Sequence, residues 1–188
     1  MYRNHLKRIF DTLLALLSLA VLWPLMCAVA VMIRLQDGGS SLFRQERVGR
    51  DGDLFTILKF RSMRVMAPNI PSVQANSVNI TPVGRLIRRS NIDELPQLLN
   101  ILRGEMSFVG PRPPLPSQTE LCELRRQNGA FKCAPGLTGL AQINSYDNMP
   151  ERDVAEWDGK YVRNITAARD IAIILATIPY LRKRPPRY

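Results

Sequence analysis

The longest uninterrupted hydrophobic segment of the chain lies near its N-terminus. From Thr12 to Ile33 no side chain is charged, and these 22 residues in a helix span roughly 33 Å, close to the thickness of a bilayer hydrocarbon core. A cleaved signal peptide has a shorter apolar region of about 7–15 residues that ends in small residues. Here Arg34-Leu35-Gln36 follows instead. The pattern therefore predicts a helix that enters lipid.

The flanks of this segment leave its topology open. Basic residues such as Lys7 and Arg8 precede it and others such as Arg34 and Arg44 follow it, so the positive-inside rule favours neither orientation. Pro24 lies near the middle of this segment. A proline there removes a backbone hydrogen bond, so we expect the helix to kink. A kinked single span and a re-entrant helix, which returns to the side it came from, fit the residues equally well.

The remainder of the chain predicts a small hairpin followed by helices. Ser41–Gln45 and Leu54–Phe60 are short apolar and aromatic segments separated by the turn-forming residues Gly49–Gly52, a pattern typical of a β-hairpin. Ala67–Ile80 contains prolines and no apolar period, which predicts a surface loop. Thr81 suits a helix N-cap and Pro82 the first helical position.

In the helix that starts at Thr81 we expect Leu86 and Ile87 to face inward and Arg85, Arg88 and Arg89 to form a basic face. A second helix is expected to carry Asp93 and Glu94 in its first turn and to end at Gly104. Further expectations are an irregular loop from Val109 to Pro116 around Arg112, a short helix from Glu120 to Asn128, a loop from Ala134 to Asn148, an apolar helix from Ile165 to Leu181 and a basic tail from Arg182 to Arg187. The fold class is thus α+β and mainly helical, with a lipid-embedded helix, a small β-hairpin and amphipathic helices at the membrane interface.

Composition narrows the chemistry. A net charge of +10 favours polyanionic partners, but 7% aromatic residues without basic-aromatic interleaving argues against nucleic acid. The cysteines Cys27, Cys122 and Cys133 have no metal-finger spacing, which excludes a zinc site of that kind. His5 is the single histidine, so carboxylates must carry any acid-base or nucleophilic chemistry.

Asp93 and Glu94 are the strongest candidates for that role. The positive end of a helix dipole favours ionised acids in the first turn. An ionised carboxylate can attack phosphorus, and its neighbour can hold Mg²⁺ against phosphate oxygens. Arg88 and the loop residue Arg112 could clamp a diphosphate. The simpler interpretation is that the acids only stabilise a helix start and the arginines only contact solvent.

Several ordered segments resemble the bacterial sugar transferases, also called monotopic phosphoglycosyl transferases, in their minimal catalytic form. The segments are Lys7–Asp11 (KRIFD), Phe43–Gly49 (FRQERVG), Lys59–Met63 (KFRSM), Asp93–Gln97 (DELPQ), Met106–Pro113 (MSFVGPRP), Pro135–Gly139 (PGLTG) and Ala141–Asn144 (AQIN). No single segment is diagnostic, but their agreement in order across nearly the whole chain is a specific signal.

The resemblance implies a two-step reaction. Asp93 attacks the β-phosphate of a UDP-sugar, releases UMP and holds the phosphosugar until polyprenyl (undecaprenyl) phosphate accepts it. Glu94 and Asp93 hold Mg²⁺. The residues expected to support substrate phosphates or their surroundings are Lys59, Arg61, Arg88, Arg112 and Gln142, with Asp170 orienting the catalytic region. This is the first membrane step of glycoconjugate assembly, as in exopolysaccharide or lipopolysaccharide biosynthesis.

The same resemblance implies a membrane topology. Residues 1–36 would form a re-entrant helix bent at Pro24, and residues 37–188 a catalytic domain on the cytoplasmic face of the bacterial inner membrane, in contact with its lipids. Whether two copies pair as a homodimer stays open.

The chain also departs from the family pattern. Ala134, Leu140, Ser145 and Tyr146 stand where many relatives carry Arg, Trp and Gly-Arg, and Glu105 stands where Asp is common. The sugar is therefore not inferred from the resemblance. Two alternatives are a non-catalytic, membrane-anchored basic adaptor for anionic lipid or nucleic acid, and an enzyme that uses free sugars or a soluble acceptor. The long lipid segment argues against a soluble acceptor.

Overall fold

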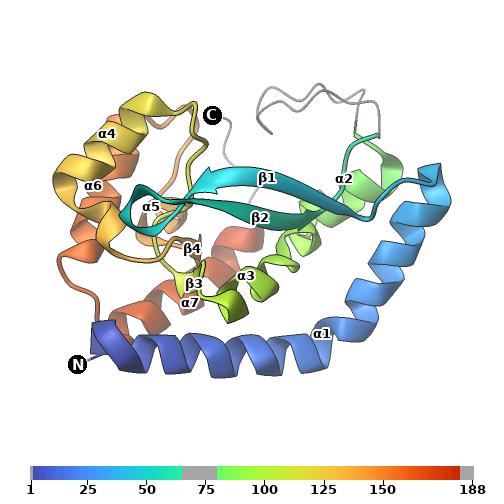
Figure 1. Ribbon diagram of the computed structural model, residues 1–188, viewed down its shortest axis with the longest axis horizontal. Coiled ribbons are helices and arrows are strands. Elements are labelled where there is room, and N and C mark those ends of the chain that lie inside the picture. The colour runs from blue at the N-terminus through green and yellow to red at the C-terminus, as the bar shows by residue number, and fades with distance from the viewer. Residues whose placement is uncertain (1, 65–79, 183–188) are drawn as a thin grey trace.

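The computed structural model describes residues 2–64 and 80–182. The predicted surface loop, apart from Ile80, and the basic tail beyond residue 182 lie outside the described residues. Within the described part, helices predominate and the strands form one antiparallel hairpin and one short parallel pair (Figure 1). The α+β, mainly helical prediction is confirmed.

Helix α1, Lys7–Asp37, is the predicted lipid-entering helix, preceded by a π-helical turn at Tyr2–Leu6. Its mean hydropathy reaches 2.5 over an 18-residue window of which only 11% is buried, so it is long and apolar enough to cross a membrane. Pro24 lies inside it. The ribbon bends midway into two arms, as the proline predicted (Figure 1).

Both arms of α1 pack against the same body of the protein. Ala15 in the first arm lies in a core cluster with Ile57 and Leu98, and Ile33 in the second lies in a cluster with Phe60 and other apolar residues. The outward side of the helix is apolar and exposed at Leu6, Ile9, Leu13, Leu16, Leu17, Val21, Trp23, Leu25, Val31, Met32 and Leu35. Large apolar patches of this kind mark a surface that meets lipid or another protein.

The predicted hairpin is confirmed. Strand β1, Leu42–Val48, pairs antiparallel with β2, Leu54–Phe60, from Leu42 opposite Phe60 to Val48 opposite Leu54. The chain turns through a 3-10 segment at Arg50–Gly52, where Asp51 adopts a positive φ of 57°. Strand β1 is longer than predicted and ends at Val48, directly before the turn.

Helix α2, Pro82–Arg89, begins as predicted, because Thr81 Oγ1 accepts a hydrogen bond from the Gly84 N–H at 2.9 Å. Ile87 is buried, but Leu86 is 62% exposed, so its inward orientation was wrong. Adjacent helical residues point about 100° apart, and the short helix buries Gly84 and Ile87, three positions apart on one face. Helix α3, Gln97–Arg103, ends at Gly104, which has the left-handed conformation predicted for it.

A second, parallel pair of strands joins the segments before and after α4, Thr119–Asn128. Strand β3, Ser107–Val109, pairs with β4, Gly136–Thr138. The predicted loop from Ala134 to Asn148 was therefore wrong in part, since it holds β4 and the short helix α5, Leu140–Ile143. The backbones of Gly110 and Gly136 approach so closely that a Cβ on Gly136 would lie 2.1 Å from the Gly110 nitrogen. Hydrophobic periodicity does not report such a backbone contact.

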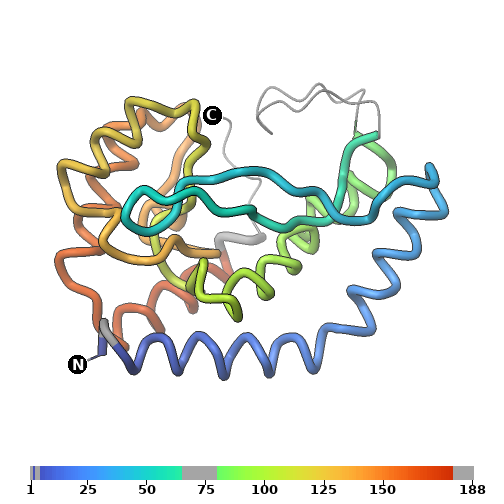
Figure 2. Tube along the Cα trace, in the orientation of Figure 1, coloured from blue at the N-terminus to red at the C-terminus, as the bar shows by residue number. Residues whose placement is uncertain are grey.

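The C-terminal half is helical. Helix α4, Thr119–Asn128, and helix α7, Ala167–Arg182, match the predicted elements, with the 3-10 segment Ala130–Lys132 after α4. Helix α6, Glu151–Val162, has no counterpart among the predicted elements. The chain returns so that the start of α7 lies beside the start of α1, where Lys7 contacts Asp170 (Figure 2).

Candidate functional site

The two candidate acids lie in a turn of their own between α2 and α3. Asp93 and Glu94 belong to a 3-10 segment, Ile92–Glu94, so their predicted position in the first turn of a helix was wrong. Pro96 has no N–H to bond the Ile92 carbonyl, which accepts from Leu95 at 3.1 Å instead. The acids therefore precede α3, and its dipole is not what fixes their charge.

Glu94 is held by two cations. Lys59 Nζ on β2 donates to Glu94 Oε1 at 2.7 Å, and Arg112 Nη2 from the proline-rich loop donates to the same oxygen at 2.7 Å. Burial raises the pKa of Glu94, but the charges and hydrogen bonds of Arg112 and Lys59 outweigh burial and hold that pKa well below its usual range. Glu94 is thus an anion at neutral pH.

Asp93 lies in a different environment, although it is the next residue. It is 9% exposed, and no group in the described part of the chain donates a hydrogen bond to its carboxylate. Burial and the negative charge of Glu94 raise its pKa to about 6, against the lowering effects of Lys59, Arg88 and Arg112. At pH 7 Asp93 is mostly ionised, and its oxygens are not committed to protein donors.

Three of the predicted basic residues surround these acids. Lys59 pairs with Glu94, and burial lowers the pKa of Lys59 while Glu94 raises it. Arg88 Nε donates to Ser62 Oγ at 2.8 Å, and the charge of Arg88 lowers the pKa of Asp93. Arg112 binds Glu94 and is 43% exposed, so it can also reach a ligand.

Arg61 is placed elsewhere. Its Nη2 forms an ion pair with Asp37 at the end of α1. This contact joins the second arm of α1 to the segment after β2, so Arg61 contacts α1 and not Asp93 or Glu94.

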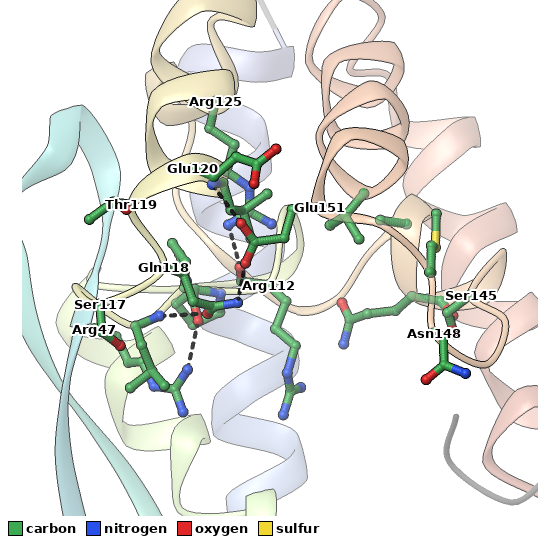
Figure 3. A pocket seen from close by; sticks show the side chains of 18 residues that line it. Arg47, Arg112, Ser117, Gln118, Thr119, Glu120, Arg125, Ser145, Asn148 and Glu151 are labelled. Carbon is green, nitrogen blue, oxygen red and sulfur yellow. Dashed lines mark hydrogen bonds between the residues drawn. The ribbon is translucent and has the colours of Figure 1, made fainter. Parts of the chain in front are cut away.

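A cavity of about 960 Å³ adjoins the acids through Arg112, which lines it together with Arg47 (Figure 3). The predicted residue Gln142 also lines this cavity. Gln142 Nε2 donates to the Leu137 carbonyl at 3.2 Å, and its buried Oε1 has no hydrogen-bond partner among the described residues. Lining residues that sequence reasoning missed include Arg47, Gln118, Asn148 and Glu151. Arg47 belongs to Phe43–Gly49, one of the segments that resemble the family, and this was the one signal in the sequence that could have marked it as a candidate.

Arg47 and Arg112 form the basic end of this cavity. Burial lowers the pKa of Arg47 to about 10, and the neighbouring charge of Arg112 contributes in the same direction. Two guanidinium groups that repel one another make a natural site for an anion such as a phosphate.

The other two supporting residues are Asp170, at the start of α7, and Pro24, inside α1. Asp170 is fully buried and accepts hydrogen bonds from Lys7 Nζ at 2.6 Å, Tyr2 OH at 2.7 Å and Tyr161 OH at 2.8 Å. It therefore ties the beginning of α1 to α7. Pro24 is on the exposed side of α1, within the helix that bends.

The departures from the family pattern fall in different places. Ala134 is buried and Leu140 packs against a core cluster, whereas Tyr146 is 49% exposed. Ser145 lines the cavity, and its Oγ donates to the Gln142 carbonyl at 2.7 Å. Of these departures, Ser145 is therefore the one that borders the candidate ligand site.

The donor set suits Mg²⁺ better than a softer metal. No cluster of three or more His, Cys, Asp or Glu side chains is found in residues 2–64 and 80–182. Mg²⁺ typically takes one or two carboxylates and completes its shell with water and phosphate oxygens. Asp93, whose pKa is raised by burial and by Glu94, offers such an oxygen beside a second carboxylate.

Comparison with known proteins identifies the chain. The family model described as bacterial sugar transferase matches residues 2–184. A UDP-glucose:undecaprenyl-phosphate glucose-1-phosphate transferase of Caulobacter vibrioides is 40% identical, over 93% of this chain and 69% of the relative. The exopolysaccharide production protein ExoY of Sinorhizobium fredii is 37% identical, over 92% and 84%. A UDP-glucose:undecaprenyl-phosphate glucose-1-phosphate transferase of Escherichia coli is 38% identical over 92% of this chain but only 39% of its own length. The chain therefore belongs to the bacterial sugar transferase family.

Proposed function

We propose that this protein transfers a sugar-1-phosphate from a UDP-sugar to polyprenyl (undecaprenyl) phosphate through a covalent intermediate on Asp93, and releases UMP. The observation that carries the proposal is the environment of Asp93, a buried carboxylate that accepts no hydrogen bond from residues 2–64 and 80–182 and lies beside a cluster of cations. The named relatives support the two substrate classes, since transferases of UDP-glucose to undecaprenyl phosphate are among them.

In the first step an Asp93 carboxylate oxygen attacks the β-phosphorus of the donor. A bond forms from that oxygen to phosphorus, and the bond from phosphorus to the bridging oxygen breaks, so that UMP leaves with that oxygen. In the second step a phosphate oxygen of polyprenyl phosphate attacks the same phosphorus. The bond to Asp93 breaks, the carboxylate is restored, and polyprenyl diphosphate sugar is the product.

A pKa of about 6 suits both roles of Asp93. The group is ionised at neutral pH and can attack, yet it is a better leaving group than a strongly basic oxygen would be. An anion in water would also have to shed tightly bound solvent, whereas burial has already removed most of it.

The neighbouring cations act on the phosphate charge. Arg88 and Arg112 neutralise the transferring group, and Lys59 keeps Glu94 ionised and oriented from the β2 side. Glu94 and Asp93 would hold Mg²⁺. When bound, that ion would offset charge on the phosphate oxygens.

The cavity beside Arg112 is the proposed donor site. Its volume of about 960 Å³ lies within the range of small-molecule sites. Arg47 and Arg112 at one end suit a diphosphate, and the polar residues Gln118, Gln142 and Ser145 offer hydrogen bonds to a base or sugar.

The membrane arrangement follows from α1. Both arms of the helix pack on one body, and its outward side is apolar, which supports a re-entrant anchor rather than a span. Ile171, Leu175 and Ile178 of α7 are also exposed and apolar. We place the catalytic body on the cytoplasmic face of the bacterial inner membrane, where a soluble donor and a lipid acceptor can both reach Asp93.

Isotope exchange tests the covalent step directly. Purified protein in lipid nanodiscs, with Mg²⁺, is incubated with UDP-glucose or UDP-galactose and labelled UMP, without polyprenyl phosphate. The expected result is label in the UDP-sugar, because the first step is reversible without the acceptor. Asp93→Asn should abolish exchange, while Asp53→Asn at the exposed hairpin turn should not.

Complete product formation with no exchange would contradict the covalent intermediate and favour direct attack by the lipid phosphate. Absence of any turnover with every UDP-sugar would instead favour the adaptor alternative. Topology is tested separately: tags at the two ends should be labelled from one side of intact vesicles, and labelling from opposite sides would reject the re-entrant helix while leaving the chemistry in place.

A further inference from the structure

The loop that carries Arg112 is attached to the protein through its carbonyl groups. Three of the four residues of Pro111–Pro114 are prolines and have no N–H to donate. Each of the four successive carbonyl oxygens accepts one hydrogen bond from a different donor. The donors are the Gly136 N–H to Pro111 at 2.9 Å, Arg125 Nη1 to Arg112 at 2.7 Å, Arg47 Nη1 to Pro113 at 3.2 Å and the Val48 N–H to Pro114 at 3.0 Å.

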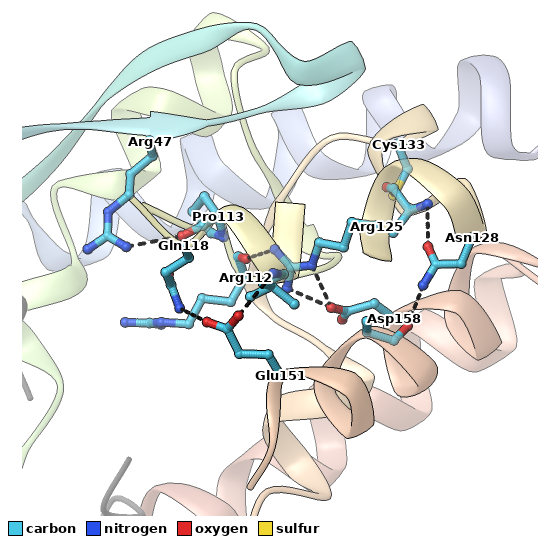
Figure 4. Close-up of polar contacts among 12 residues, drawn as sticks. Arg47, Arg112, Pro113, Gln118, Arg125, Asn128, Cys133, Glu151 and Asp158 are labelled. Atoms are coloured by element: carbon cyan, nitrogen blue, oxygen red, sulfur yellow. Dashed lines mark hydrogen bonds and ion pairs between the residues drawn. The ribbon is translucent and has the colours of Figure 1, made fainter. Parts of the chain in front are cut away.

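Arg125 differs from the other donors because it is itself fixed on its far side. Its side chain, on α4, is 2% exposed, and its Nε and Nη2 donate to Asp158 Oδ2 on α6 at 2.8 and 2.6 Å. The remaining nitrogen, Nη1, reaches the Arg112 carbonyl (Figure 4). One planar guanidinium thus joins two helices to the backbone of the loop.

The contact lies one residue from the proposed chemistry. The backbone of Arg112 is held by Arg125, and its side chain binds Glu94 at 2.7 Å and acts electrostatically on Asp93. The Arg112 side chain is 43% exposed, and its ion pair with Glu94 holds it at the guanidinium end. Because a side chain reaches only as far as its backbone allows, the position of the Arg112 backbone limits where that guanidinium can lie.

We propose that Arg125, oriented by Asp158, is a positioning residue for the transfer reaction: it fixes the backbone of Arg112 and so places that guanidinium opposite Glu94 and the donor phosphates. The inference rests on the proposed function, and it adds two residues, Arg125 and Asp158, that act on the reaction through Arg112. A displacement of about 1 Å in a catalytic group can lower a rate by about 100-fold, so a contact that prevents it matters for turnover.

The main test removes the buried pair as a unit. Replacing only one partner would strand a buried charge, whereas apolar replacement of both is often tolerated. For Arg125→Met combined with Asp158→Leu, the expected result is a fall in kcat for UMP release of about 10- to 100-fold with a similar unfolding temperature. The matched control is Arg126→Met with Glu123→Leu, which removes an exposed ion pair from the same helix and should change neither quantity.

Two further measurements separate positioning from stability. In an Arg112→Met background, removal of the Arg125–Asp158 pair should lower activity no further, because its effect passes through Arg112. The acidic limb of the rate-pH profile should also move to higher pH when the pair is removed, since the Arg112 charge lowers the pKa of Asp93.

Arg125→Lys provides a milder variant that decides the matter if the double variant does not fold. A single ammonium can still pair with Asp158 but lacks the fork that reaches the Arg112 carbonyl as well. The expected result is a stable protein with lowered kcat. Unchanged kcat in both variants, or a loss that multiplies with that of Arg112→Met, would overturn the proposal. A parent protein that shows no UMP exchange would fail the proposed function instead.

Discussion

Asp93 and Asp170 are both buried carboxylates near cations, yet their surroundings differ in kind. Asp170 is fully buried, and its two oxygens accept hydrogen bonds from Lys7, Tyr2 and Tyr161. Asp93 has cations nearby but accepts no hydrogen bond in the described part of the chain, and its pKa is raised to about 6. Protein donors bind both oxygens of Asp170, whereas no donor among the described residues binds Asp93.

The difference separates an acid that holds two helices together from the acid that we propose as the nucleophile. Three protein donors hold the two oxygens of Asp170 inside the protein, so Asp170 serves the contact between α1 and α7. A buried carboxylate that accepts no hydrogen bonds destabilises the folded protein, because it has lost the hydrogen bonds that it made with water. At Asp93 the same lack of donors leaves an oxygen available for the attack on phosphorus that we propose.

The largest effect on stability is expected at Asp170. Asp170→Asn removes the negative charge from the buried pair with Lys7 and leaves the ammonium without its counterion. The expected loss is about 3–5 kcal/mol of unfolding free energy, measured by chemical denaturation in detergent micelles. A loss below 1 kcal/mol would mean that the three donors to Asp170 contribute little to the docking of α1.

Asp93→Asn should have the opposite effect on stability. A carboxyl group whose folded pKa is raised from 3.8 to about 6 carries a penalty that is complete above pH 6 and absent below about pH 4. The variant should therefore be more stable than the parent by roughly 1–3 kcal/mol at pH 7.5, and equally stable near pH 4. Greater stability of the parent at pH 7.5 would show that Asp93 is not under strain.

The pH dependence of activity should follow the ionisation of Asp93. Since only the carboxylate attacks, the rate should fall about tenfold per unit of pH below about 6. Rates of UMP release across pH 4.5–8, on protein shown to remain folded at each pH, provide the measurement. A flat profile down to pH 4.5 would rule out a raised pKa at the nucleophile.

The smallest change is expected at Glu94. Glu94→Gln removes the negative charge that raises the pKa of Asp93, so the acidic limb of the profile should move to lower pH even as the maximal rate falls. Glu46→Gln, at an exposed position on β1, is the control and should leave the limb in place. A shift of the acidic limb of the rate-pH profile to higher pH would show that Lys59 and Arg112, once they have lost their contact with the Glu94 carboxylate, no longer lower the pKa of Asp93.

Local signals in the sequence predicted much of this fold. The hairpin follows from turn residues between apolar segments, the start of α2 from Thr81 and Pro82, and the end of α3 from Gly104. Asp93 and Glu94 are consecutive residues, so the sequence alone shows that they lie side by side. Lys59, Arg88 and Arg112 lie close to these acids, and their contact with substrate phosphates stays a prediction.

Contacts distant in sequence account for the rest. Strand β4 exists because glycine backbones meet β3 across the fold, a fact that hydrophobic periodicity does not encode. Arg61 and Asp37 pair only once α1 has folded back. The charge of Asp93 was expected to follow from a helix dipole, but burial and Glu94 dominate, and both are properties of the assembled site.

The bend in α1 bears on how the proposed re-entrant anchor would enter a membrane. An anchor whose two ends remain on one side moves no polar segment through the hydrocarbon layer, where each charged side chain would be costly to transfer. For the proposed anchor, the hydrocarbon layer would have to accept only the apolar bend around Pro24. Such a bend could insert after the chain has left the ribosome, with the folded body already at the membrane surface.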